Sequence, residues 1–322
     1  FTWNKGEEEV SEFDADFEII NTPAYKDSPF ATIIDGSAGI RRRLEGEKPV
    51  LDYPVLEEIL EQGATDYVAM PLVFSDGQRN VFSMMTDHKG GFTTDALGHI
   101  YEIMPALSRL IEMHYIRRTA VTLLDTYLGK QTGKRVLDGQ VKRGDGEDLH
   151  SVIWFCDLRN STPLADSMSR EAFLNLLNEY FECLAGAVLD HDGEVLRFIG
   201  DAALAIFPVT EEGWSVDEAC EAAVAAAKDA LGRMAKLNNQ RESFGAPPLG
   251  FGIGLHLGDV MYGNIGTAER IEFTVIGAAA NEAARIEGLC KPLDVNFLIS
   301  EQVREHLKGK WQSLGKHALR GV

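Results

Sequence analysis

Hydrophobic and polar residues alternate with two different periods along the chain, and each period predicts its own kind of element. In the first third, the β-rich stretches 67–74 and 80–86 flank residues 75–78 (Ser-Asp-Gly-Gln), a sequence typical of a turn. This pattern predicts a β-hairpin. Two glycines at 90–91 end that unit, and residues 93–95 offer side chains that favour the N-terminus of a helix.

The next segment keeps a seam of nine positions at alternating spacings of three and four, and seven of the nine are apolar. The seam runs through Ile100, Ile103, Leu107, Leu110, His114, Arg117, Val121, Leu124 and Leu128. Such a repeat is typical of a two-stranded coiled coil and predicts a homodimer. A helix packed on its own domain is the alternative. Gly129 and Gly133 then end the helix, and 130–150 is predicted to be a polar linker.

From residue 151 onward, apolar segments of strand length alternate with segments of helical period. Strands are predicted at 151–157, 194–199, 202–207, 250–257, 260–266, 271–276 and 295–300, and helices at 163–189, 216–237, 278–290 and 301–307. This order predicts an α+β fold with a ferredoxin-like βαββαβ domain. A small α/β domain and the coiled-coil helix precede it. The predicted domains are therefore 1–98, 99–150 and 151–322.

Composition excludes several classes of protein. The chain has 322 residues, of which 45% are hydrophobic and 25% charged, ordinary values for globular domains. A net charge of −19 argues against nucleic-acid binding, which needs a basic surface. The apolar runs are far shorter than the ~20 residues that a membrane span needs, so no span is expected within this chain.

The four cysteines, Cys156, Cys183, Cys220 and Cys290, lack the paired spacing of a zinc site or a disulfide framework. They fit a reducing compartment, and a cytoplasmic location is expected. The chain opens at Phe1 rather than at Met, which is typical of a fragment. What precedes Phe1 or follows the last residue therefore stays open.

Two carboxylates stand where metal chemistry needs them. Asp157 ends a predicted buried strand, and Asp201 lies at the tip of a predicted neighbouring hairpin. Carboxylates at adjacent strand ends can share divalent cations, and Mg²⁺ typically takes one or two carboxylates together with substrate phosphates. Either aspartate alone is more often a turn or capping residue.

A polar turn follows Asp157 and opens a helix. Pro163 suits the first helical position, with Thr162 as its cap. Exposed N–H groups at this helix start, around Asn160, Ser161 and Thr162, favour a polyphosphate. An ordinary capped helix has the same signature.

Five stretches together resemble the catalytic domain of class III nucleotidyl cyclases. They are residues 155–162 (Phe-Cys-Asp-Leu-Arg-Asn-Ser-Thr), 193–201 (Gly-Glu-Val-Leu-Arg-Phe-Ile-Gly-Asp), 254–266, 273–277 (Phe-Thr-Val-Ile-Gly) and 281–285 (Asn-Glu-Ala-Ala-Arg). The stretches keep the family's order and spacing, and the resemblance covers about 151 to 322. The hairpin and long helix before them are similar to the end of a GAF- or PAS-type sensor domain.

The resemblance to the cyclases implies a site. Asp157 and Asp201 match the two metal-binding aspartates, which implies two Mg²⁺ or Mn²⁺ ions per site. Asn281 matches the residue that orients the ribose, and Arg285 matches the one that stabilises the α-phosphoryl group. Arg320 lies near the family's triphosphate-binding basic residue. In this family the aspartates and the Asn–Arg pair come from different chains of a head-to-tail homodimer.

The reaction implied is attack of the nucleotide's own 3′-hydroxyl on the α-phosphorus, which releases pyrophosphate and leaves a 3′,5′-cyclic monophosphate. Positioning and charge stabilisation do most of this work, and no histidine is needed as a base. His256 is accordingly expected to be a strand residue. A small-molecule or protein signal of unknown identity is expected to act on the N-terminal domain and regulate the enzyme through the coil.

The sequence departs from the family at two positions expected to recognise the base. Adenylate cyclases usually carry Lys where Arg197 stands and Asp or Thr where Ala278 stands, and guanylate cyclases carry Glu and Cys. Arg197 can still donate to a ring acceptor, whereas Ala278 makes no side-chain hydrogen bond. ATP is the expected substrate because it is the family's commonest, and GTP or a pyrimidine nucleotide stays open.

Two further functions compete with an active mononucleotide cyclase. A catalytically degenerate cyclase domain would act as a nucleotide-binding or dimerisation module. Arg197 and Ala278 favour that alternative, and the four intact metal and catalytic positions oppose it. A diguanylate cyclase is disfavoured because its Gly-Gly-Asp-Glu-Phe loop is missing, and residues 199–203 read Ile-Gly-Asp-Ala-Ala instead.

Overall fold

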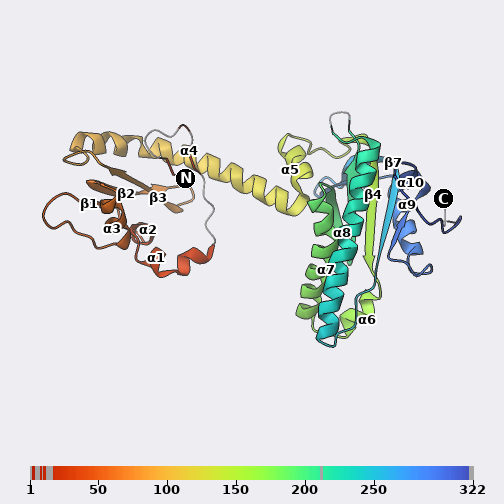
Figure 1. Cartoon of the computed structure of the whole chain (residues 1–322). Coiled ribbons are helices and arrows are strands. Elements are labelled where there is room, and N and C mark those ends of the chain that lie inside the picture. The colour runs from red at the N-terminus through yellow and green to blue at the C-terminus, as the bar shows by residue number, and fades with distance from the viewer. Residues whose placement is uncertain (1, 4–7, 9, 12–16, 211–212, 319–322) are drawn as a thin grey trace. The chain divides into compact units, whose positions relative to one another are not determined.

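The computed structural model describes the chain except for residues 1, 4–7, 9, 12–16, 211–212 and 319–322 (Figure 1). Its contacts divide it into two compact units, Phe1–Thr119 and Ala120–Val322. This boundary falls inside the 35-residue helix α4, Thr94–Leu128. No helix in the described ranges combines the length and the apolar content needed to cross a membrane.

The first unit is built on a three-stranded antiparallel sheet in the order β1-β2-β3. Its elements are η1 Phe17–Asn21, α1 Pro23–Lys26, α2 Pro29–Ile34, β1 Ile40–Arg43, α3 Pro54–Glu61, β2 Asp66–Val73 and β3 Arg79–Thr86. The predicted hairpin is confirmed, because β2 pairs with β3 from Asp66↔Thr86 to Val73↔Arg79. The sheet separates two small hydrophobic cores, one shared with α2 and α3 and the other with α4.

The first half of α4 covers one face of this sheet. Ile100 and Leu107 pack against the core formed by Val68, Met70 and Leu72. These two seam positions therefore follow the alternative, a helix packed on its own domain. Ile103 and Leu110 are 58% and 63% exposed, and the coiled-coil dimer stays a prediction.

The predicted polar linker 130–150 is wrong in part, because it contains the helix α5, Lys130–Leu137, and the start of strand β4 at Gly146. Gly129, with φ of 85°, turns the chain between α4 and α5. A buried hydrogen-bond network then holds α5: the Thr132 hydroxyl donates to Glu194 at 2.8 Å, and the Tyr262 hydroxyl donates to the same carboxylate at 2.8 Å. The residues that make these contacts lie far apart in the sequence, so local composition does not reveal them.

The second unit is a six-stranded sheet in the order β5-β6-β4-β7-β8, with β9 pairing in parallel to β7. Its strands are β4 Gly146–Leu158, β5 Glu194–Ile199, β6 Ala202–Pro208, β7 Phe251–Gly266, β8 Ile271–Ile276 and β9 Phe297–Ile299. Its remaining helices are α6 Ser161–Asp166, α7 Arg170–Asp190, α8 Val216–Ser243, α9 Ala278–Leu289 and α10 Glu301–Glu305. The expected α+β, ferredoxin-like class is the class observed (Figure 1).

Strand β4 lies at the centre of this sheet and faces two cores. Trp154 and Cys156 belong to the larger core with α7 and α8, whereas Ile153 belongs to a second core that includes Ala279 and Ala283 of α9. This two-sided burial explains the nearly continuous apolar sequence of the strand. Its last residues carry Asp157 to the edge of the core.

Two predicted stretches divide into elements differently in the structure. The segment 163–189 belongs to two helices, because the side chain of Ser169 accepts a hydrogen bond from the Ala172 amide and so caps the start of α7. The two segments 250–257 and 260–266 form one strand, β7, which pairs along all of β4. The predicted hairpin with 271–276 is confirmed as the pairing of β7 with β8.

Candidate active site

Asp157 and Asp201 lie together at one end of the main sheet. Asp157 pairs with Ala202 across β4 and β6, and Asp201 precedes Ala202 in the turn of the β5–β6 hairpin. Gly200, with φ of 66°, makes that turn possible. Burial, and next the negative charge of Asp201, raise the pKa of Asp157. A cation beside this pair would favour the charged form of Asp157.

The donor set fits a divalent cation that takes its remaining ligands from elsewhere. In the described part of the chain, no group of three His, Cys, Asp or Glu side chains could hold a metal ion. Mg²⁺ commonly keeps several waters and binds one or two carboxylates plus substrate phosphates. Two aspartates without a third protein ligand suit that chemistry.

Glu287 is a third carboxyl near this pair that the sequence analysis missed. It is 8% exposed on α9, and a Cβ at Gly252, the strand partner of Asp157, would lie 2.1 Å from its Oε1 atom. Burial, and next the charge of Asp157, raise the pKa of Glu287 to about 7. The feature of the sequence that could have identified Glu287 is an acidic residue at a core-facing position of an Ala-rich helix.

The turn after Asp157 differs from its prediction. Helix α6 begins at Ser161, so Pro163 is not its first residue, and Asn160 rather than Thr162 is the N-cap. Asn160 has φ of 58° and its side chain makes no capping hydrogen bond; its Oδ1 instead accepts from Nζ of Lys291 at 3.3 Å. Asn160, Ser161 and Thr162 nonetheless stay on one short turn directly after the Asp157 strand.

Helix α9 presents Asn281 and Arg285 four residues apart, and hence on one face. Asn281 is exposed and donates to the Gly277 carbonyl at 3.4 Å, and Arg285 is half-buried. The opposite face, with Ala279 and Ala283, packs on the sheet. Rigid packing on one side leaves the other side free to position polar groups.

His256 lies on β7, as expected, and is 5% exposed. Its Nε2 lies 3.1 Å from Oε2 of Glu282, the residue after Asn281, while its Nδ1 is buried without a hydrogen-bond partner in the described residues. Burial lowers the pKa of His256, and Glu282 opposes that effect. The pair ties α9 to the sheet beside Asn281.

The two positions expected to read the base lie on different elements. Arg197 lies on β5, and its Nη1 is 3.1 Å from Oε1 of Glu272 on β8. Ala278 is the exposed first residue of α9. Arg197 Nε and Thr274 Oγ1 are buried with no hydrogen-bond partner among the described residues. Arg320 lies outside the described residues.

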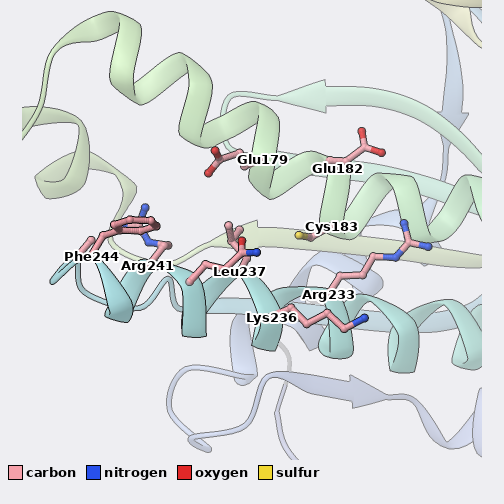
Figure 2. Close-up of a pocket in the computed structure, with 10 residues that line it drawn as sticks. Glu179, Glu182, Cys183, Arg233, Lys236, Leu237, Arg241 and Phe244 are labelled. Carbon is pink, nitrogen blue, oxygen red and sulfur yellow. The ribbon is translucent and has the colours of Figure 1, made fainter.

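A separate cavity of about 570 Å³ lies between α7 and α8. Figure 2 shows Glu179, Glu182 and Cys183 on α7 facing Arg233 and Lys236 on α8. Burial raises the pKa of Cys183, which makes it a poor nucleophile. None of the predicted site residues lines this cavity.

Comparison with known proteins points to one family. The family described as "Adenylate and Guanylate cyclase catalytic domain" matches residues 148–321. An adenylate cyclase of Anabaena cylindrica is 34% identical over 171 residues, which are 52% of this chain and 32% of that protein. An uncharacterized protein of Mycobacterium tuberculosis is 32% identical over 201 residues, 62% of this chain and 33% of its own length. The matched region thus spans about a third of each relative.

Solved structures agree. The adenylyl cyclase CyaB from P. aeruginosa superposes with a TM-score of 0.50 at 25% identity, covering 55% of this chain and 91% of that one. A bacterial light-regulated adenylyl cyclase has a TM-score of 0.55 at 21% identity and covers 85% of this chain and 78% of its own; at this identity the likeness concerns the fold alone.

Proposed function

Because the chain belongs to the family of adenylate and guanylate cyclase catalytic domains, we propose that it converts a nucleoside triphosphate, ATP first among them, to the 3′,5′-cyclic monophosphate and pyrophosphate. The observation that carries this proposal is the meeting of Asp157 and Asp201 at the ends of adjacent strands. Burial, and next the charge of Asp201, raise the pKa of Asp157, and a bound cation would favour its charged form.

Asp157 and Asp201 would hold Mg²⁺ or Mn²⁺, two ions per site. Such ions make the 3′-hydroxyl more acidic and stabilise the leaving pyrophosphate. The turn with Asn160, Ser161 and Thr162 follows Asp157 directly and would contact the polyphosphate through its backbone N–H groups. Arg320 is proposed to bind the same part of the substrate.

Asn281 and Arg285 supply the other half of the proposed site, from the second chain of a head-to-tail homodimer. Asn281 would hold the ribose, so that the 3′-oxygen lies in line with the α-phosphorus. The attack is intramolecular, and holding the sugar supplies most of the needed proximity. Arg285 would place a permanent positive charge beside the oxygens of the transferring phosphoryl group.

ATP is proposed as the substrate because two similar proteins are named adenylate or adenylyl cyclases. Arg197 would donate to a ring nitrogen of the base. Ala278 offers no side-chain acceptor for the base, so GTP and pyrimidine nucleotides stay open as alternative substrates. The same departure at Ala278 favours a second candidate, a degenerate domain that binds nucleotide without turnover.

The N-terminal part, 1–98, is proposed as a sensor that regulates the enzyme through residues 99–150. Support comes from α5, which follows α4 and is fixed to the sheet by the buried Thr132–Glu194–Tyr262 network. Strand β5, which carries Glu194, leads to the hairpin turn with Asp201. A movement of α5 would therefore reach the metal-binding end of the sheet.

Activity is tested by supplying each of the four nucleoside triphosphates with Mg²⁺ or Mn²⁺ and measuring cyclic nucleotide. We expect cyclic AMP from the unmodified chain, and losses of at least ~100-fold in Asp157→Ala and Arg285→Ala. Asp166→Asn, an exposed aspartate on α6, serves as the matched control and should keep full activity. Tight binding of a nucleotide with no product from any of the four would select the degenerate domain.

The shared site has its own test. Equal amounts of the inactive Asp157→Ala and Arg285→Ala chains are mixed and allowed to exchange. A heterodimer restores one intact site of two, so activity should return to about a quarter of the unmodified value if half of the dimers are mixed. No recovery, in a mixture shown to contain heterodimers, would contradict the proposal that the site forms between chains.

A further inference from the structure

Helix α9 packs on strand β7 where two glycines leave the strand almost bare. Residues 254, 256 and 258 of β7 share one face, because side chains alternate along a strand. A Cβ atom at Gly254 would lie 2.6 Å from the carbonyl oxygen of Ala283, and one at Gly258 would lie 2.7 Å from the Cβ of Ala279. His256 therefore supplies the side chain that stands between these two close contacts.

Glycine and alanine fix how closely a helix approaches a strand, but they resist rotation of the helix poorly, because few side chains interlock. A polar contact is directional and can hold one register. His256 makes such a contact: its Nε2 lies 3.1 Å from Oε2 of Glu282 on α9, and the two side chains are 7% and 23% exposed. The contact is thus mostly shielded from water, which strengthens it.

The ring of His256 has one protonation state that suits this place. Nε2 carries a proton, because a lone pair so close to a carboxylate oxygen would be repelled. Nδ1 is buried and has no hydrogen-bond partner in the described residues, so a second proton there would be an unpaired buried donor. Burial accordingly lowers the pKa of His256, although Glu282 acts in the opposite direction. A neutral ring with its proton on Nε2 is the expected form.

The contact lies beside the two polar side chains that α9 presents. Glu282 follows Asn281 directly, and Arg285 comes three residues later on the same helix. Rotation of α9 about its axis therefore moves all three side chains together. On a helix 10–12 Å in diameter, a rotation of ~10° shifts a surface atom by about 1 Å. A shift of that size can lower a reaction rate ~100-fold where reacting groups must be aligned.

We propose that His256 and Glu282 are positioning residues, and that their contact fixes the rotation of α9 so that Asn281 and Arg285 face the nucleotide. This inference rests on the proposed function, since Asn281 and Arg285 have their roles only there. His256 and Glu282 act through α9 and do not touch the reacting atoms. Loss of the contact should slow the chemical step more than it weakens nucleotide binding.

The test compares steady-state kinetics of Glu282→Ala, Glu282→Gln and the control Glu305→Ala, an exposed residue of α10. His256 is nearly buried, so a variant there risks unfolding, and Glu282 is the residue changed. We expect Glu282→Ala to lower kcat ~10- to 100-fold with KM for ATP within about threefold. Glu282→Gln keeps an acceptor oxygen and should restore most of kcat. Glu305→Ala should leave both constants unchanged.

A double-variant cycle separates positioning from an independent effect. If Glu282 acts through the side chains of α9, then Glu282→Ala should cost less in an Asn281→Ala chain than in the unmodified chain. An unchanged kcat in Glu282→Ala, or effects that multiply fully in the double variant, would overturn the inference. A fall in the thermal unfolding midpoint of Glu282→Ala with kcat unchanged would also overturn it, by assigning a structural role.

Failure of the proposed function is a different outcome. If the unmodified chain forms no cyclic product from any nucleoside triphosphate, hydrogen exchange of residues 278–289 replaces the kinetics. Faster exchange in Glu282→Ala than in Glu282→Gln and Glu305→Ala would still support the hold of this contact on α9. Equal exchange in the three variants would reject it, whatever the catalytic result.

Discussion

Gly254 shows how a single residue sets the position of the proposed catalytic side chains. A methyl group there would lie 2.5 Å from the amide nitrogen of Glu287 and 2.6 Å from the carbonyl oxygen of Ala283. Both atoms belong to the backbone of α9, which cannot yield without moving as a helix. Any side chain at this position would displace Asn281 and Arg285 together.

We therefore expect Gly254→Ala to destabilise the second unit by about 1–3 kcal/mol. The control is Gly232→Ala on α8, where an added methyl group meets nothing within 4 Å and should be neutral or stabilising by up to ~1 kcal/mol. Urea unfolding followed by tryptophan fluorescence measures both variants, since Trp154, Trp214 and Trp311 all lie in this unit. Equal stability of the two variants would contradict the tight packing of α9.

Residue positions were predictable only where the local pattern carried them. The meeting of Asp157 and Asp201 could be predicted because the sequence places one at the end of a strand and the other at the tip of the neighbouring hairpin, and their role as metal ligands stays a proposal. Glu272 and Glu287 could not be, since each depends on a partner about 75 or 130 positions away in the chain, Arg197 and Asp157, which local periodicity does not reveal. The positions of these two side chains depend on the approach of β8 to β5 and of α9 to the sheet.

Among the elements, α4 departs most clearly from its predicted pattern. Its predicted seam includes positions covered by the sheet of the first unit. Five large hydrophobic side chains are exposed on its second half, and apart from Tyr115 they are Met113, Ile116, Leu123 and Tyr127. Their spacings of three, seven and four residues place them along one stripe. If the helix pairs with a second copy, this stripe is the expected contact.

A charge on that stripe should weaken the proposed dimer. We expect Leu123→Glu, at a position that is 53% exposed, to raise the dimer dissociation constant about tenfold or more, because a carboxylate would be buried between two apolar helices. Thr126→Glu, exposed on the same helix, is the control and should change it little. Sedimentation equilibrium of the full chain measures the dimer dissociation constant of each variant. Identical constants for Leu123→Glu and Thr126→Glu would exclude the stripe from the interface.

The attachment of α4 to the first unit should depend on pH through Glu112. This carboxylate is buried against the turn after β2, where it accepts hydrogen bonds from the Ser75 amide at 2.9 and 3.0 Å. The Ser75 hydroxyl, and to a smaller extent Arg109, hold the pKa of Glu112 below its usual value of 4.5. The resulting stabilisation is complete above that value and is lost as the pH falls through the lower, folded-state pKa.

Hydrogen exchange of residues 94–112, measured between pH 6 and pH 3 after correction for the intrinsic rate, should show progressive loss of protection as the pH falls. Glu112→Gln should start with weaker protection and show a shallower pH dependence, since the amide cannot titrate. Glu102→Gln, on an exposed part of α4, should behave like the unmodified chain. A Glu112→Gln profile as steep as that of the control would refute this role.

Most long elements could be predicted from periodicity, and the exceptions have physical causes. The single helix expected at 163–189 is divided where Ser169 caps a new start, a signal hidden by the continuous apolar pattern. The helix α5 has a polar sequence with one glycine inside it and one directly before it, and its buried contacts with distant strands help to stabilise it. Local propensity is a weak guide where tertiary contacts decide.

At the scale of the whole molecule, the two units differ in what is known of them. The family match begins at residue 148, so it covers most of the second unit and none of the first. The first unit has a fold but no assigned ligand, and its role as a sensor stays a proposal. The predicted segment 99–150 contains most of α4, all of α5 and the start of β4, and we propose that α4 and α5 carry any signal.

The anchoring of α5 also has a consequence for the order of folding. Thr132 meets Glu194 and Tyr262, which follow it by 62 and 130 residues. A ribosome synthesising this chain releases α5 before either strand exists, and the network is complete only once β7 has followed β5. Contacts of such long range form slowly. Helix α5 is thus synthesised early, and its hydrogen bonds to β5 and β7 can form only late in the synthesis of the second unit.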